Sequence, residues 1–200
     1  MKLTDAKLKS LIAFILKNKK DLITLTDYFE YQDIENGILK IPDYFINVGI
    51  KDKIVNIGQI HNYLKDYTVL FQSGCILLDL RLNLKQLGPI SAKYMISIKD
   101  FRFSDDFTRI YATFQEDVSS LGNIMQSMAL KAAISGGTAL QKAVKLTNCN
   151  FILIDDHNIM IELSKFDIIK KVSEFFEINY IDSTDGCLKF NFYYSGGEKD

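Results

Sequence analysis

Several features are scarce in this chain of 200 residues, and some of these absences exclude classes of protein. There is no tryptophan, there are only two prolines and three cysteines, and no apolar run reaches the ~18 residues of a membrane-spanning helix. Cys75, Cys149 and Cys187 form no C-x-x-C pair, so neither a disulfide framework nor a zinc knuckle is expected. Free thiols that pack as small apolar groups are the favoured interpretation, and they favour a reducing compartment.

An excess of charge of either sign is also missing. Lys plus Arg number 24 against 25 Asp plus Glu, which leaves a net charge of -1. A dedicated nucleic-acid binder would need a clustered basic excess, so no nucleic-acid partner is predicted. The apolar run at residues 11–16 is too short for the core of a secretory signal and is followed by lysines. We therefore predict a cytoplasmic location.

Motifs that carry chemistry are absent as well. No G-x-S-x-G, H-E-x-x-H or Cys/His nucleophile pattern occurs. The run Asp155-Asp156-His157 could form the corner of a metal site, but adjacent residues point in different directions, and a tight turn is favoured. The carboxylate pairs Asp105-Asp106 and Asp182/Asp185 fall in predicted turns too. No catalytic residue, metal ligand or cofactor is predicted, which favours a protein that is not an enzyme.

What the chain does contain is a ladder of alternating apolar and polar residues from Cys75 to Val118. A period of two is typical of β-strands, because successive side chains point to opposite faces. A strand predicted at 67–71 leads into this region, which turn residues divide into three more, at 75–84, 90–103 and 108–118. The four strands would form an antiparallel meander. A change of phase between Ile98 and Phe101 predicts a bulge near Lys99-Asp100.

The segments before the ladder predict a helix, a hairpin and a second helix. The helix at 4–19 has an apolar stripe and a lysine face, which fits either an anionic membrane surface or docking on the protein itself, and docking is favoured. The hairpin spans 22–41, with its turn at Asn36-Gly37 and its end at Pro42. The second helix is predicted over 52–66.

After the ladder, the apolar period becomes helical over residues 121–146. The run Ser135-Gly136-Gly137-Thr138 interrupts it. Because this run lacks the Lys-Ser/Thr ending of a phosphate loop, a helix break is favoured, with Thr138 as the cap of the second half. The remaining chain predicts strands at 151–155 and 159–163, a helix at 166–176, and a hairpin that pairs 177–181 with 187–194.

The helix at 121–134, with its methionines and alanines, is predicted to cover the apolar face of the sheet. Bulky sheet residues opposite small helix residues can interdigitate as ordinary core, which is favoured, or leave an apolar groove for a lipid-like ligand. Under the groove hypothesis the ligand-binding residues are Ile76, Leu78, Leu80, Leu82, Tyr94, Ile96, Ile98, Met125 and Met128.

The order of these elements, with strands at 150–154 and 158–163 after the long helix, resembles one half of a tubular lipid-binding (TULIP-type) domain. The similarity covers residues 67–165 and rests on pattern, with no diagnostic residue motif. It implies a curved sheet that wraps a helix and encloses an apolar ligand channel. Small bacterial members of that family usually begin with a secretory or lipoprotein signal, which is not predicted here, and residues 1–66 have no counterpart.

The sequence therefore predicts an α+β fold in a single domain over 1–200, with parts at 1–66, 67–147 and 151–194. Its antiparallel curved meander sheet is packed on one face by a long broken helix, and a C-terminal hairpin-helix-hairpin follows. The predicted function is non-enzymatic binding of an apolar or lipid-like ligand in the sheet–helix groove. The alternative is a protein-interaction or assembly subunit whose apolar surface is closed by a partner or by self-association into a homo-oligomer. A peripheral membrane contact through the N-terminal helix stays an open alternative to docking of that helix on the protein.

Overall fold

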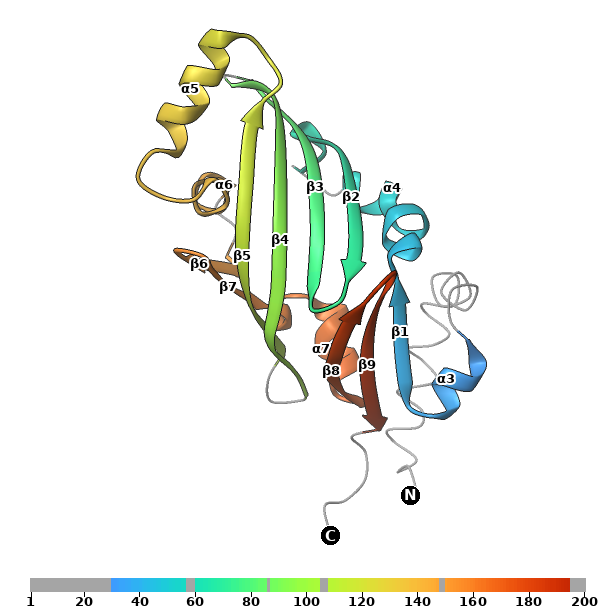
Figure 1. Ribbon diagram of the computed structural model, residues 1–200. Coiled ribbons are helices and arrows are strands. Elements are labelled where there is room, and N and C mark those ends of the chain that lie inside the picture. The colour runs from blue at the N-terminus through green and yellow to red at the C-terminus, as the bar shows by residue number, and fades with distance from the viewer. Residues whose placement is uncertain (1–29, 57–59, 86, 105–107, 148–149, 195–200) are drawn as a thin grey trace.

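A computed structural model describes residues 30–56, 60–85, 87–104, 108–147 and 150–194. These residues form an α+β fold built on one nine-stranded antiparallel sheet (Figure 1), in which β1-β9-β8-β4-β5-β7-β6 are successive neighbours and β3 and β2 extend from β4. The strands are β1 (Ile38–Pro42), β2 (Leu64–Gln72), β3 (Cys75–Leu84), β4 (Gly88–Phe103), β5 (Thr108–Ser120), β6 (Ile152–Asp155), β7 (Asn158–Glu162), β8 (Phe176–Thr184) and β9 (Cys187–Tyr194).

The helices and helical turns of the described residues lie in the connections between strands, except α3, which precedes β1. They are α3 (Tyr31–Glu35), the π-helical turn η1 (Phe45–Gly49), α4 (Lys51–Val55), the 3₁₀ turn η2 (Ile60–Asn62), α5 (Ile124–Ile134), α6 (Ala139–Thr147), the 3₁₀ turn η3 (Leu163–Lys165) and α7 (Asp167–Ser173). The helix predicted over 4–19 lies outside the described residues.

The predicted meander is confirmed, since β2, β3, β4 and β5 pair in chain order and antiparallel. The predicted bulge is confirmed too: the register between β4 and β5 shifts between Ile98 and Asp100. Beyond this bulge β4 pairs with a different strand on one side. Its first part pairs with β3, whereas Arg102 and Phe103 at its end pair with Asn179 and Ile178 of β8.

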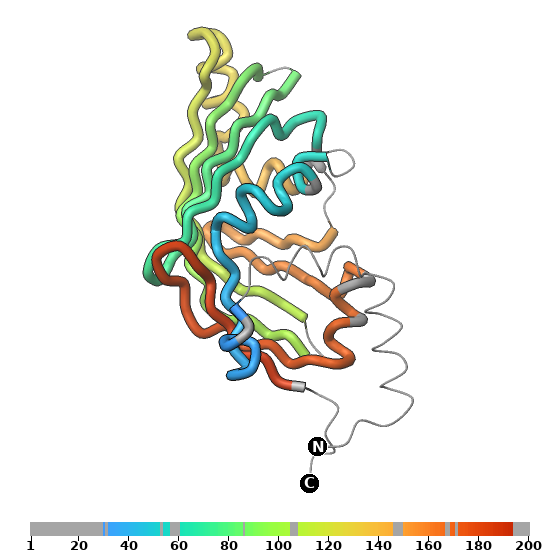
Figure 2. Tube along the Cα trace, turned by 90° about the vertical axis from the view of Figure 1, so that its right-hand side faces the viewer, coloured from blue at the N-terminus to red at the C-terminus, as the bar shows by residue number. Residues whose placement is uncertain are grey.

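The apolar core lies on one face of the long strands. Figure 2 shows these strands as a curved layer, with α4 and the β6–β7 hairpin on the same side of it. One cluster is built on the buried residues Leu64, Tyr67, Val69 and Phe71 of β2, against which side chains of η1 and α4 pack. A second cluster is built on Ala92, Tyr94, Phe114 and Ile159, and Leu140 of α6 packs against it.

Two predictions near the N-terminus are wrong. The hairpin predicted over 22–41 lies outside the described residues up to residue 29; in its described part residues 31–35 form α3, and β1 takes its ladder partner from the far end of the chain, since Leu39 pairs with Phe190 of β9. The helix predicted over 52–66 is also wrong, since α4 ends at Val55 and β2 begins at Leu64. Part of the helical spacing comes from two short pieces, α4 and the 3₁₀ turn η2, rather than from one helix.

The outer edge of β2 is covered by side chains rather than by another strand. The Asn47 carboxamide donates to the Val69 carbonyl at 2.7 Å and accepts the Val69 N–H at 2.8 Å. The Asp66 carboxylate accepts the N–H of Tyr67 at 2.9 Å, and the Phe71 carbonyl accepts the N–H of Gly186 at 3.0 Å. These contacts occupy backbone groups that would otherwise be free to recruit another strand.

Candidate functional site

The structure places the predicted ligand-binding residues of the sheet on one face. Leu78 lies opposite Tyr94 and Ile76 lies opposite Ile96, while Leu80, Leu82 and Ile98 continue the same alternation. Tyr94 is buried, and its burial is the main reason why its pKa is raised above the usual tyrosine value. The apolar side chains on this face pack in the two core clusters, with α4, η1 and α6 supplying neighbours.

Met125 and Met128 do not join these residues, so the predicted cover of the sheet by this helix is wrong. Their exposed fractions are 79% and 67%, and neither belongs to a core cluster. Figure 1 shows α5 beside β5, at the margin of the sheet, and not across its apolar face. Of α5, Leu130 is buried, whereas α6 packs against the second core cluster through Leu140.

The predicted helix break explains this arrangement. Gly136 has φ +79, a left-handed conformation that most residues avoid, and α5 ends before it at Ile134. The Thr138 hydroxyl then accepts the N–H of Gln141 at 3.1 Å and caps α6, which confirms the predicted cap. The Lys142 ammonium donates to the carbonyls of Ala133 and Ser135, at the end of α5. The two helices therefore form a corner that turns α5 away from the sheet face.

A carboxylate of the sheet anchors this corner. Glu116 of β5 accepts the N–H groups of Ala139 and Leu140 at 2.5 and 3.1 Å, in the first turn of α6. Backbone N–H groups in a first helical turn lack partners within the helix, so a carboxylate is a favourable cap there.

The start of α5 is held just as firmly. The Asn123 side chain accepts the N–H of Gln126 at 2.9 Å, and the Gln126 side chain accepts the N–H of Asn123 at 3.1 Å, which together form a capping box. The same Gln126 side chain lies against Gly88 and Gly122, where an added Cβ would approach it to 2.4 and 1.7 Å. At Gly88, whose φ is +71, a side chain would strain the backbone, whereas at Gly122 it would mainly displace the movable end of the Gln126 side chain.

The helix α5 exposes apolar side chains to solvent while its covered face is half polar. Its covered face carries Gln126, Ser127, Leu130 and Ile134, two of which are polar. Its exposed face is apolar, apart from Lys131 at its border. We call this face, together with the adjacent residue of the β5–α5 connection, the α5 surface; its members are Leu121, Ile124, Met125, Met128, Ala129, Ala132 and Ala133.

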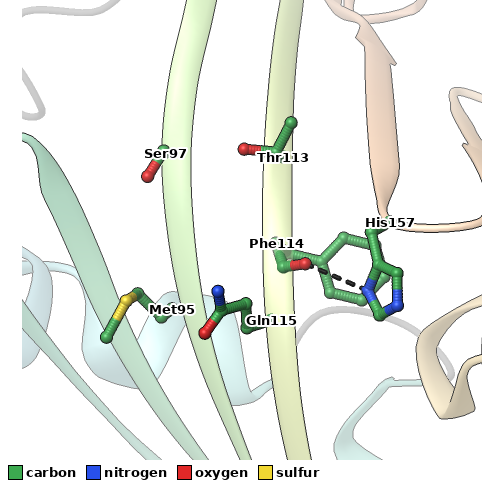
Figure 3. A pocket seen from close by; sticks show the side chains of 6 residues that line it. All are labelled: Met95, Ser97, Thr113, Phe114, Gln115 and His157. Atoms are coloured by element: carbon green, nitrogen blue, oxygen red, sulfur yellow. Dashed lines mark hydrogen bonds between the residues drawn. The ribbon is translucent and has the colours of Figure 1, made fainter.

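A hollow of about 380 Å³ with a mixed lining lies elsewhere, on the outer face of the sheet, and is lined by Met95, Ser97, Thr113, Phe114, Gln115 and His157 (Figure 3). The His157 ring is held at its border, with Nδ1 3.1 Å from the Phe114 carbonyl oxygen. The predicted turn Asp155–Asn158 is confirmed, and Asp156 takes φ 50 there.

A second, smaller hollow of about 150 Å³ borders β1 and α3. It contains the ion pair between Lys40 and Asp33, 2.9 Å apart, and the hydrogen bond in this pair raises the pKa of Lys40. Neither of these two hollows is lined by a predicted ligand-binding residue.

Among the residues that the structure describes, no group of three or more His, Cys, Asp or Glu side chains could hold a metal ion. Within the same part of the chain, no helix has the length and apolarity needed to cross a membrane. No protein-family model, curated protein or solved structure matches this chain. The similarity to tubular lipid-binding domains thus stays a prediction.

Sequence reasoning missed the α5 surface because residues 121–134 are apolar nearly all around the helix, so periodicity did not identify the covered side. One signal was present in the chain. No Asp or Glu occurs between residues 119 and 154, although the chain has 25 of them.

Proposed function

We propose that this protein is a non-enzymatic docking protein whose α5 surface is closed by contact with another molecule. The observation that carries this proposal is the exposed apolar row: Leu121, Ile124, Met125 and Met128 are exposed by 56%, 79%, 79% and 67%, although Leu130 of the same helix is buried. Single exposed apolar side chains are ordinary, but a contiguous row of them marks interaction surfaces.

The anchors of α5 support the same interpretation. A capping box, the Gly88 and Gly122 contacts and the Lys142 cap fix the helix at both ends. The helix is therefore presented rigidly, which lowers the entropic cost of binding through it. Methionine adds adaptable contacts to such a surface, since its side chain is flexible and polarizable.

Binding of an apolar ligand at the sheet face is the second candidate. It is favoured by the concentration of Ile and Leu opposite Tyr94 and Ile96 on one face of the sheet. Native mass spectrometry of the purified protein separates this candidate from docking, because only the ligand hypothesis expects a co-purified apolar molecule in the folded monomer.

The test of docking compares two matched variants in the cells that make the protein. Ile124→Gln/Met125→Gln/Met128→Gln removes the apolar row of the α5 surface, and Leu70→Gln/Met95→Gln removes two exposed apolar side chains from the outer sheet face. After gentle lysis, we expect wild type and the outer-face variant to be recovered in a large assembly or with membranes. The α5 variant should be recovered as free chain. An identical distribution of all three proteins contradicts docking through α5.

A further inference from the structure

We propose that the molecule that closes the α5 surface is an anionic lipid bilayer. This inference rests on the proposed function and names the partner of the same surface. It starts from charge: the α5–α6 segment carries Lys131, Lys142 and Lys145 and no acidic residue. In a chain whose total charge is -1, this is a local cationic region beside an apolar one.

A further lysine lies near the start of α5. Lys85 belongs to the β3–β4 turn, and the register brings this turn to the same end of the sheet as Ser120, where the β5–α5 connection begins. The N–H of Leu121 donates to the Pro89 carbonyl at 2.9 Å, which joins the two connections directly. Lys85 is exposed, as are Lys131 and Lys145.

The two acidic groups that precede α5 along β5 do not cancel this charge at the surface, and Asp155 and Asp156 stand at the end of β6, which contacts α6 through the Gln141–Ile154 hydrogen bond. The Glu116 carboxylate points to the N-terminus of α6 and accepts the N–H groups of Ala139 and Leu140. Asp117 takes the opposite phase of β5 and pairs with Lys93 across the strands, on the outer face. Neither carboxylate belongs to the α5 surface.

The shape of the surface fits a bilayer boundary. Eleven helical residues span roughly 16 Å, enough for α5 to lie flat with its row of Ile and Met side chains among the upper acyl chains. Figure 1 shows α5 at the outside of the molecule, beside β5 and without a neighbouring strand beyond it. Lys131 at the border of the row could place its aliphatic stem along the apolar region and its ammonium at the headgroups.

The same charge disfavours a second copy of this chain as the occupant. A symmetric contact between two α5 surfaces would bring Lys131 of one copy close to the cationic segment of the other, with no acidic residue on the surface to compensate. Anionic lipid headgroups supply the missing negative charge, and each lysine near such a membrane strengthens binding by about fivefold.

The experiment measures co-sedimentation of the full chain with vesicles of phosphatidylcholine alone or of phosphatidylcholine with phosphatidylglycerol. We expect binding to the anionic vesicles that is at least about tenfold stronger than to the neutral ones. Lys131→Glu/Lys145→Glu should weaken it by about tenfold or more, as should Ile124→Gln/Met125→Gln/Met128→Gln. Lys93→Glu on the outer sheet face is the charge control, with half the change of charge of the double variant, and should bind like wild type. Circular dichroism confirms that each variant is folded.

The outcomes separate this inference from the proposal on which it rests. If wild type binds neither vesicle, or if the Lys93→Glu control loses as much binding as the α5 variants, the bilayer is not the occupant. In that case the proposed docking function still stands if the α5 variant, unlike wild type, is recovered from cells as free chain. A doubled mass of wild type that the α5 variant lacks would identify a second copy as the occupant instead and overturn the bilayer proposal. If no variant of α5 changes either measurement, both proposals fall.

Discussion

Glu116 of β5 and Leu140 of α6 are joined by a hydrogen bond of 3.1 Å from the Leu140 N–H to the Glu116 carboxylate. Leu140 packs against the core cluster of Tyr94 and Phe114, so the pair fixes α6 over the apolar face of the sheet. Because Lys142 of the same helix holds the end of α5, Glu116 also determines, through α6, where the α5 surface lies.

Replacement of Glu116 by Gln should destabilise this corner. The amide of Gln offers one acceptor oxygen in place of a charged carboxylate with two, so an N–H group of the first turn of α6 loses its partner. Loss of a hydrogen bond to a charged group costs about 1–3 kcal/mol in free energy of unfolding. Chemical denaturation measures the change, and Asp117→Asn on the outer face is the control. Equal stability of E116Q and wild type would show that the cap contributes nothing.

Asn47→Ala should expose the edge of β2. The change removes both hydrogen bonds to the backbone of Val69, leaving a donor and an acceptor of an edge strand without these partners. We expect a loss of about 1–3 kcal/mol in free energy of unfolding and a greater tendency to aggregate through strand pairing. Asn56→Ala, which removes one exposed bond to Asp52, is the milder control. Light scattering during heating should separate the two variants, and the same aggregation onset in both contradicts the edge-covering role of Asn47.

Acid should weaken the contact between β5 and β7. Hydrogen bonds from Ser164 and then from Arg109 hold the pKa of Glu162 below its ordinary value of 4.5. A carboxyl with a lowered pKa in the folded state stabilises the protein above its ordinary pKa, and this stability is lost as the pH falls through the lowered value. We compare denaturant midpoints at about pH 7 with those at about pH 4 and below. The midpoint of Glu162→Gln should fall less over this range than that of wild type. The difference is small, because the pair is partly exposed to solvent. Parallel curves for the two proteins would contradict the role assigned to Glu162.

At high pH, deprotonation of the Tyr94 phenol should destabilise the folded protein. Burial, and to a lesser degree the nearby Glu116, raise the pKa of this phenol, so the folded state holds its proton more tightly than the unfolded chain does. Its stabilising effect is complete below the ordinary tyrosine pKa and is lost as the pH rises above it. Tyr94→Phe should therefore retain stability to a higher pH than wild type, as measured by alkaline denaturation. Tyr63→Phe, at an exposed position, should behave like wild type, and the same alkaline midpoint for Tyr94→Phe would contradict the expectation.

The strands of the ladder were predictable because each is long and its alternation is uninterrupted. β3 matches its predicted bounds, and even the bulge after Ile98 left a visible change of phase in the sequence. The break at Gly136 was predictable too, because two adjacent glycines disfavour a helix through their own backbone freedom, independently of distant contacts.

What could not be predicted depends on contacts between distant residues. The partner of β1 is β9, nearly the whole chain away, so nothing local indicated that residues 31–35 would not form its hairpin partner. The direction of α5 depends on Glu116, Lys142 and Gly88, which belong to three different elements. Apolar periodicity describes the faces of a helix but not which of them meets the protein, and so Met125 and Met128 were placed over the sheet.

Methionine oxidation tests most directly the central proposal, that the α5 surface is exposed in the isolated protein and covered by a partner in cells. The chain contains its own control. Met125 and Met128 lie on the α5 surface, and Met95, exposed by 45%, lies on the outer sheet face. In the purified protein, peroxide should oxidise all three to sulfoxide readily, as followed by peptide mass spectrometry. In intact cells, Met125 and Met128 should be protected several-fold relative to Met95, because α5 is docked. Equal oxidation of the three methionines in cells, or protection of Met125 and Met128 in the purified monomer, would contradict the docking function.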